Sequence, residues 1–135
     1  MNMPTPQQLN SILLPNTALY GLQYTQTEPN IVATITQNEH NSQHTGVIQG
    51  GVLCVLAETV ANMAGSLAVP RDRYVVLGQS LNTHYIRGAT GTITATVEPI
   101  RVGRSSCVYS VEMTDERGKT VAISTFTGSK VKRKA

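Results

Sequence analysis

One acidic residue interrupts the longest apolar stretch of the sequence. Glu58 is the only charged residue between Glu39 and Arg71, and it lies in the run VLCVLAETVANMAGSLAV. If this run is a helix, Asn62 at i+4 and Ser66 at i+8 lie on the same face as Glu58. Carboxylates are rarely buried unless they are paired or functional, so we interpret Glu58 as a partly buried catalytic group. The alternative is a polar stripe that faces solvent, although such a face normally carries Lys or Arg as well.

Two glycines, Gly50 and Gly51, stand where this helix would begin. Free N–H groups at a helix N-terminus attract negative charge, and glycine lets a carbonyl approach the backbone closely. Acyl transfer needs such an oxyanion donor together with a carboxylate that attacks or activates water. Along one helix, however, Gly50 and Glu58 are separated by about 12 Å of rise. Two helices packed antiparallel across a two-fold axis would bring Gly50 of one chain near Glu58 of the other, so this chemistry requires a dimer.

Hydrophobic periodicity predicts the elements that hold these groups. A short amphipathic helix at the N-terminus should stop at Pro15, and a polar loop should cover residues 37–45. We predict further a hairpin over 19–36, one long apolar helix up to residue 69, and a meander of four strands near 74–86, 92–97, 107–113 and 120–131. An antiparallel sheet wrapped around one helix is an α+β fold. A helix that is apolar on most sides needs more cover than one sheet face gives, which again favours a dimer.

The segments GVIQGGVLCVLAETVANMAGSLA and LNTHYIRGATGTITATVEPIRVGRSSCVYSVEMTDERGKTVAIST resemble hotdog-fold acyl-CoA thioesterases. The closest likeness is to the PaaI-type branch with 4-hydroxybenzoyl-CoA and 1,4-dihydroxy-2-naphthoyl-CoA thioesterases, and it covers roughly residues 37–130. The resemblance implies a single hotdog domain over residues 1–135, with an antiparallel sheet around one long central helix. It also implies hydrolysis of a small acyl- or aryl-CoA to free acid and coenzyme A, with no cofactor.

The resemblance assigns catalytic roles to five residues. Glu58 matches the catalytic acid, which attacks the thioester or acts as base for water, and Gly50 matches the N–H donor that polarises the thioester oxygen. Gln43 matches a Gln or Asn that positions the reacting groups. Asn62 stands where relatives carry a small hydroxyl residue that holds the attacking water. Many relatives have His-Gly-Gly where this chain has Gln49, which can donate a hydrogen bond near the oxyanion but cannot titrate.

The resemblance also implies substrate contacts. His84 matches a strand position that lines the acyl pocket in some relatives, and Gly51 adjoins the oxyanion donor. The phosphates of coenzyme A need cationic and hydroxyl partners. The set expected to meet them comprises Arg87, Arg104, Ser105 and Ser106. Ordinary surface solubility is the alternative explanation for both arginines.

Composition and net charge limit the classes of partner that we expect for this chain. The net charge is +3, and much of the excess lies in a basic tail at residues 130–135 that could help to attract a polyanion such as coenzyme A. The sequence contains no zinc-type spacing, aromatic RNA-binding signature or helix-turn-helix pattern, so we expect no nucleic-acid partner and no metal. Glu58 inside the apolar run argues against a membrane span. Two cysteines, Cys54 and Cys107, and the lack of a secretory signal predict a cytoplasmic location.

Two other functions stay open. A hotdog domain could bind acyl-CoA without hydrolysing it, and Gln49 is the feature that favours this alternative. A hotdog dehydratase acting on acyl-carrier-protein substrates would need a catalytic histidine near the start of the long helix, where this chain has none. We expect a homodimer at minimum, with a dimer of dimers (a homotetramer) as the expected assembly.

Overall fold

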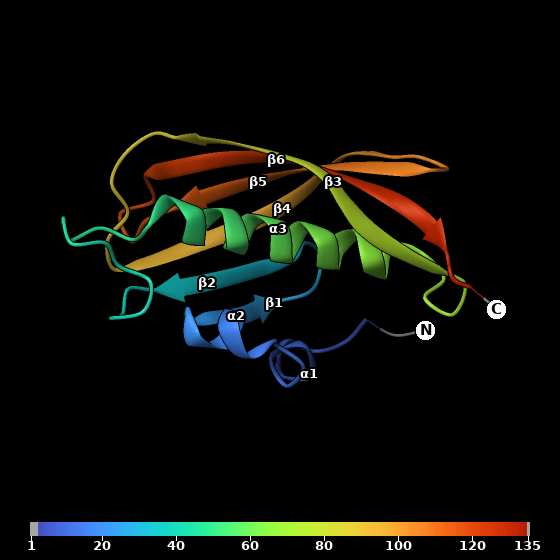
Figure 1. The fold of residues 1–135 in the computed structure, drawn as a ribbon, viewed down its shortest axis with the longest axis horizontal. Coiled ribbons are helices and arrows are strands. Elements are labelled where there is room, and N and C mark those ends of the chain that lie inside the picture. The colour runs from blue at the N-terminus through green and yellow to red at the C-terminus, as the bar shows by residue number, and fades with distance from the viewer. Residues whose placement is uncertain (1–2, 135) are drawn as a thin grey trace.

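The computed structural model describes residues 3–134. It contains one six-stranded antiparallel sheet that curves around a single long helix, so the predicted α+β architecture is confirmed (Figure 1). In chain order the elements are α1 (Pro6–Asn10), α2 (Pro15–Leu19), β1 (Leu22–Gln26), β2 (Val32–Thr36), α3 (Gly50–Leu67), β3 (Tyr74–Tyr85), β4 (Thr92–Val102), β5 (Ser106–Thr114) and β6 (Thr120–Lys132).

Helix α3 lies across the inner face of the sheet and forms the centre of the core (Figure 1). By length and composition alone α3 could cross a membrane, but much of its apolar surface packs on the sheet. Its buried residues recur at helical spacing and include Val52, Leu53, Leu56, Ala57, Val60, Ala61 and Gly65. The opposing strands contribute alternate side chains, among them the fully buried Phe126 of β6. The predicted buried helix is therefore confirmed, beginning at Gly50.

The strand order is β1-β2-β4-β5-β6-β3, which corrects the predicted four-strand meander. Strands β4, β5 and β6 form a meander, but β3 pairs with β6 and stands at the edge of the sheet. A period of two identifies a strand without saying which neighbour it pairs with. The twelve residues of β3 thus have a strand partner on one side only within the described chain. Leu77, Tyr85 and Ile86, on or beside this strand, leave about half of their surface exposed.

The N-terminal segment also differs from the prediction. Pro15 does not end a helix but begins α2, because proline lacks an N–H and is well suited to the first helical turn. Helix α1 ends earlier, at Asn10, and Thr5 caps its start by accepting a hydrogen bond from the Gln8 backbone. Both short helices pack beside β1, where Figure 1 shows them below the sheet.

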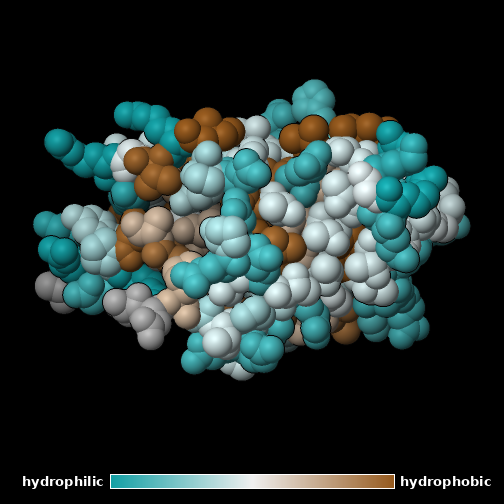
Figure 2. Space-filling model, turned by 180° about the vertical axis from the view of Figure 1, so that it is seen from behind, coloured by the Kyte–Doolittle hydropathy of each residue, from teal (hydrophilic) through white to brown (hydrophobic). Residues whose placement is uncertain are grey.

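At the other end of the chain, β6 continues to Lys132, so the first part of the expected basic tail is a strand; Ala135 lies outside the described residues. Seen from behind, the surface is largely hydrophilic or neutral, with apolar residues gathered in part along its upper rim (Figure 2).

Candidate active site

Glu58 lies in the third turn of α3 and faces β3. A Cβ added at Gly78 would come within 3.3 Å of the Glu58 carboxylate, so glycine at this point of β3 makes room for the acid. Within residues 3–134, Glu58 has no hydrogen bond or ion pair with another side chain. In the single chain Glu58 is exposed, which corrects the expectation of partial burial. Its carboxylate lies beside β3, the strand at the edge of the sheet.

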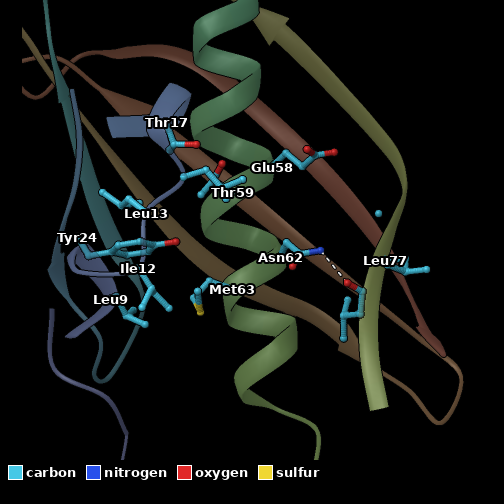
Figure 3. Close-up of a pocket in the computed structure, with 13 residues that line it drawn as sticks. Leu9, Ile12, Leu13, Thr17, Tyr24, Glu58, Thr59, Asn62, Met63 and Leu77 are labelled. Carbon is cyan, nitrogen blue, oxygen red and sulfur yellow. Dashed lines mark hydrogen bonds between the residues drawn. The ribbon is translucent and has the colours of Figure 1, made fainter. Parts of the chain in front are cut away.

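A cavity of about 450 Å³ opens beside Glu58, between α3, the two N-terminal helices and β3 (Figure 3). One wall is apolar and comes from the N-terminal segment, with Leu9, Ile12, Leu13 and Leu14. The α3 wall is mainly polar, with Glu58, Thr59 and Asn62 beside Met63. The cavity therefore combines an apolar chamber with a carboxylate, a combination typical of small-molecule sites.

Asn62 is fixed in place by two hydrogen bonds. Its side-chain Nδ2 donates to the Val76 carbonyl of β3 at 3.0 Å (Figure 3). Its Oδ1 accepts from the Ser66 hydroxyl at 3.3 Å. The predicted stripe of Glu58, Asn62 and Ser66 on one face of α3 is thus confirmed. The amide keeps one N–H and one lone pair that could hold a further polar group.

A second cavity, of about 360 Å³, lies at the N-terminus of α3 and is lined by Gln43, Gly50, Tyr85 and Arg87 among others. The Gln49 carbonyl accepts the first intrahelical bonds of α3. The N–H groups of Gly50 and Gly51, which precede those donors, have no acceptor among the described residues. An unpaired pair of N–H groups at a helix N-terminus is suited to an anionic or polarised oxygen.

The loop before α3 is held by a residue that sequence reasoning missed. Asn41 is fully buried, and its side-chain Nδ2 donates to the carbonyls of Tyr20 and Thr36, both at 2.9 Å. Its own carbonyl accepts the backbone N–H of Gln49 at 2.8 Å. Asn41 thereby fixes where α3 begins. Nothing in the polar stretch distinguishes Asn41 from the neighbouring amide residues, because buried residues in a loop do not recur at a regular spacing.

Gln43 lines the second cavity, whereas Gln49 does not. Gln43 is half-buried, and its side-chain carbonyl accepts from the Thr45 hydroxyl at 2.8 Å. Gln49 is exposed at the N-cap position of α3, and its side chain does not cap the helix. Its amide is therefore free to turn toward a ligand at the helix N-terminus.

A polar cluster connects α3 to the end of β3. The Cys54 thiol lies 3.0 Å from the Tyr85 hydroxyl and 3.5 Å from the hydroxyl of Thr83. Thr83 in turn shares a hydrogen bond of 2.7 Å with the buried Ser124. The hydrogen bond with Cys54, helped by burial, raises the pKa of Tyr85 to about 12. Tyr85 therefore stays a neutral phenol at physiological pH. Cys54 and Cys107 are both free thiols, the first partly buried and the second buried.

The remaining predicted residues lie apart from both cavities. Thr83 and Tyr85 face α3, so His84 between them points to the outer face of the sheet. His84 lines neither cavity, so the structure does not bring it together with the proposed acyl pocket. Arg104 and Ser105 lie in the turn from β4 to β5 and Ser106 begins β5, near the C-terminal half of α3. Within residues 3–134, no cluster of His, Cys, Asp or Glu has the composition of a metal site.

The chain is similar to known proteins over most of its length. Residues 45–122 match the family model described as Thioesterase superfamily, which is more than half of the chain. The chain belongs to the thioesterase superfamily. Membership agrees with the hotdog arrangement of one long helix within an antiparallel sheet, and it supports thioester hydrolysis as the general activity.

Individual relatives of this thioesterase-family chain agree. A Vibrio cholerae protein named as an esterase is 34% identical over 130 residues, covering 93% of this chain and 86% of the relative. A Listeria monocytogenes 1,4-dihydroxy-2-naphthoyl-CoA hydrolase is 35% identical over 102 residues, covering 74% of this chain and 80% of the relative. The structure of a mutant Pseudomonas aeruginosa thioesterase superposes with a TM-score of 0.93 at 26% identity, covering 98% of this chain and 97% of that one. The structure of a Haemophilus influenzae thioesterase superposes with a TM-score of 0.91 at 28% identity, covering 97% of this chain and 93% of that one.

Proposed function

We propose that this chain hydrolyses a small acyl- or aryl-CoA thioester to the free acid and coenzyme A. The observation that carries the proposal is Glu58, a carboxylate that has no side-chain partner among residues 3–134 and lies in the lining of a cavity with an apolar wall. A carboxylate in that position can attack a carbonyl carbon or take a proton from water. Membership of the thioesterase superfamily supports the reaction, and the Listeria relative that hydrolyses a CoA thioester supports the carrier.

The proposed site is completed by a second copy of the chain. Within one chain, Glu58 and Gly50 line different cavities, and a long helix separates them. Strand β3 leaves a long edge open, and such edges in natural proteins are normally covered or paired. An antiparallel pair of β3 strands with its two-fold axis near Leu81 and Asn82 would set Gly78 of one chain opposite Tyr85 of the other.

That pairing would join the two halves of the site. Gly78 lies beside Glu58 of its own chain, and Tyr85 lies over Gly50 of its own chain. When Gly78 and Tyr85 of two copies stand opposite each other, Glu58 of one copy therefore approaches Gly50 of the other. The homodimer is thus a requirement of the proposed chemistry, and its further pairing into a homotetramer and its cytoplasmic location stay predictions.

In the proposed reaction, the Gly50 N–H donates a hydrogen bond to the thioester oxygen and stabilises its charge as the carbonyl carbon becomes tetrahedral. Glu58 of the second copy either attacks that carbon or accepts a proton from the attacking water. Asn62 orients the water with the donor that its structural bonds leave free. Collapse of the intermediate breaks the carbon–sulfur bond. If Glu58 acts as the base, the thiolate of coenzyme A takes up the proton that Glu58 accepted from water, and the acyl group leaves as the free acid. If Glu58 attacks, collapse leaves an anhydride between the acyl group and Glu58, and a water molecule then hydrolyses it, giving the free acid and supplying the proton of the thiol.

For the nucleotide we propose the residues named from the sequence. Arg104, Ser105 and Ser106 would meet the phosphates at the β4–β5 turn, where the neighbouring Arg101 adds a second guanidinium close to Gly103. Arg87 lines the Gly50 cavity, although its Nε already donates to the Thr120 carbonyl at 3.0 Å. Gln43 and Gln49 would support the oxyanion side of the same cavity.

Release of thiol from a panel of acyl-CoAs tests the proposal. The panel runs from acetyl to palmitoyl and includes benzoyl and hydroxyaryl thioesters. We expect rapid hydrolysis of one chemical class, reduced about 10²- to 10⁴-fold in Glu58→Ala. Glu39→Ala, which removes an exposed loop carboxylate, is the matched control and should hydrolyse at the wild-type rate. If no thioester is hydrolysed but acyl-CoA binds tightly, the chain is a binding module.

A further inference from the structure

Tyr24 carries the one buried side-chain polar atom in residues 3–134 that lacks a hydrogen-bond partner. The residue lies on β1, its side chain is on the inner face of the sheet, and only 3% of its surface is exposed. Buried hydroxyl groups in proteins almost always find a partner, so each exception calls for an explanation. The backbone of Tyr24 is well satisfied, since Asn10 bonds both its N–H and its carbonyl. The unpaired group is the phenol alone.

Tyr24 is one of the residues that line the cavity beside Glu58, and its hydroxyl oxygen is covered by neighbouring side chains. Figure 3 shows the Tyr24 hydroxyl pointing toward α3, on the side of Thr59 and Met63, whereas the Glu58 carboxylate points away from it toward β3. Thr17 of α2 and Thr59 of α3 bring two further hydroxyl groups to the lining of the cavity, on the Tyr24 side of α3. Thr17 makes only a long contact of 3.5 Å to Asn16, and Thr59 has no side-chain hydrogen bond within the described residues. The cavity thus has a carboxylate end and a hydroxyl end.

Apolar side chains surround the hydroxyl end, on the Tyr24 side of α3 (Figure 3). Leu9, Ile12, Leu13 and Met63 would contact a carbon skeleton and could not bond an oxygen. Burial raises the pKa of Tyr24 to about 12, so its phenol is protonated at neutral pH and can both donate and accept. The hydroxyl is closed to bulk solvent, and Met63 beside it is flexible enough to shift when a ligand enters.

We propose that Tyr24 binds an oxygen atom at the far end of the acyl group, with Thr17 and Thr59 beside it. The enzyme would then select thioesters whose acyl part carries a hydroxyl or oxo group distant from the thioester carbon. This inference rests on the proposed function, because it takes Glu58 as the reacting end of the cavity. The physical reason is that an oxygen atom of the ligand would form the hydrogen bond that the Tyr24 hydroxyl lacks within residues 3–134. An acyl group without that oxygen would leave it unpaired.

Matched thioesters test this selection. We would compare kcat/KM for benzoyl-CoA and for its 2-, 3- and 4-hydroxy derivatives. In the wild type we expect at least one hydroxy isomer to be favoured by about tenfold or more. Tyr24→Phe removes only the hydroxyl and should bring that ratio close to one. Tyr109→Phe is the matched control, since Tyr109 is a buried tyrosine that lines neither cavity, and its ratio should equal that of the wild type. Equal rates for all four thioesters in the wild type, or an undiminished ratio in Tyr24→Phe, would overturn the proposal.

Binding of inert analogues separates this inference from the proposed function. In a phenacyl or hydroxyphenacyl thioether of coenzyme A, a methylene stands between sulfur and carbonyl, so no thioester can be hydrolysed. Calorimetry should show tighter binding of a hydroxylated analogue to the wild type, by about tenfold, and no such preference in Tyr24→Phe. A preference found without any hydrolysis of the thioesters would support the role of Tyr24 and contradict the thioesterase proposal. Absence of any preference would contradict the role of Tyr24.

The ligand-free protein gives an independent readout. Because the phenol has no partner, Tyr24→Phe should unfold at the same urea concentration as the wild type or at a higher one. A lower unfolding midpoint would show that the hydroxyl is bonded within the protein, and would contradict the proposal.

Discussion

The ring of Tyr85 lies directly against the backbone of Gly50. A Cβ added at Gly50 would come within 2.9 Å of ring atom Cζ, closer than real side chains approach one another. Glycine at this position therefore allows the last residue of β3 to cover the first turn of α3. The contact holds the open edge strand and the free N–H groups of the helix in a fixed relation, and the proposed two-subunit site depends on that relation.

Alanine substitutions at the two adjacent glycines should have opposite effects on stability. Gly50→Ala must displace the Tyr85 ring, and we expect it to lower the free energy of unfolding by roughly 1–3 kcal/mol. Gly51→Ala meets nothing within 4 Å, and the gain in helix propensity should raise stability by up to about 1 kcal/mol. Urea unfolding followed by circular dichroism would measure both. Equal effects of the two substitutions would contradict the close Tyr85 contact.

Substitutions at Asn62 and Ser66 should distinguish a direct role of the Asn62 amide in catalysis from a purely structural one. Asn62→Ala removes the bond to the Val76 carbonyl as well as the proposed water ligand, so both stability and kcat should fall. We expect a loss of about 1 kcal/mol in unfolding free energy and at least a tenfold loss in kcat. Ser66→Ala removes only the donor to Asn62 Oδ1 and should reduce kcat much less. A kcat for Asn62→Ala equal to that of Ser66→Ala would exclude a direct role for the amide.

The loop anchor Asn41 offers a third comparison. Asn41→Ala leaves the carbonyls of Tyr20 and Thr36 without their buried donor, and we expect it to cost roughly 2–4 kcal/mol of unfolding free energy. His40→Ala, at the exposed neighbouring position, should change stability by no more than about 0.5 kcal/mol. A mild effect of Asn41→Ala in the same urea titration would show that the loop is held by other contacts.

Much of the fold could be predicted from the sequence because buried apolar residues recur at the regular spacing of a helix or a strand. The alternation in β4 and β5 and the apolar run of α3 each identify their element. Strand order leaves no such trace, so the position of β3 at the sheet edge was not predicted correctly. Pro15 likewise fits either the end or the start of a helix, and only packing of the N-terminal segment decides between them.

The pH dependence of stability should reflect Asp115 in the β5–β6 turn. A hydrogen bond from the Arg117 side chain, followed by backbone N–H groups of Lys119 and Arg117, holds the pKa of Asp115 below its ordinary value of 3.8. Because the folded-state pKa is depressed, the stabilisation is fully present above the unfolded-state pKa and is lost as the pH falls through the folded value. Asp115→Asn should therefore differ from the wild type in unfolding free energy at pH 7 and differ less at pH 3. A difference that grows on acidification would contradict this assignment.

Site residues could be predicted from the sequence where they interrupt the hydrophobic pattern of an element, and they could not be predicted where they fit that pattern. Glu58 stands out because it is an acid in an apolar helix, and Gly50 because glycine begins that helix. Tyr24 obeys the alternation of β1 and reads as an ordinary inward side chain, so only the missing partner of its hydroxyl reveals it. The exposure of Glu58 could not be foreseen, since the apolar sequence around it does not say how much of its cover a single chain supplies.

Mixing two inactive variants tests the shared site most directly. Glu58→Ala and Gly50→Pro, which removes the backbone N–H at a helix position that tolerates proline, would be purified separately, unfolded and refolded together, and assayed for thiol release from the best acyl-CoA. If the carboxylate and the oxyanion donor come from different subunits, each mixed dimer has one site with both groups intact, and random pairing restores about a quarter of wild-type activity. If both groups act within one chain, every site stays defective and the mixture remains as inactive as its components. We predict recovery to about a quarter, and a mixture without recovery would contradict the shared site.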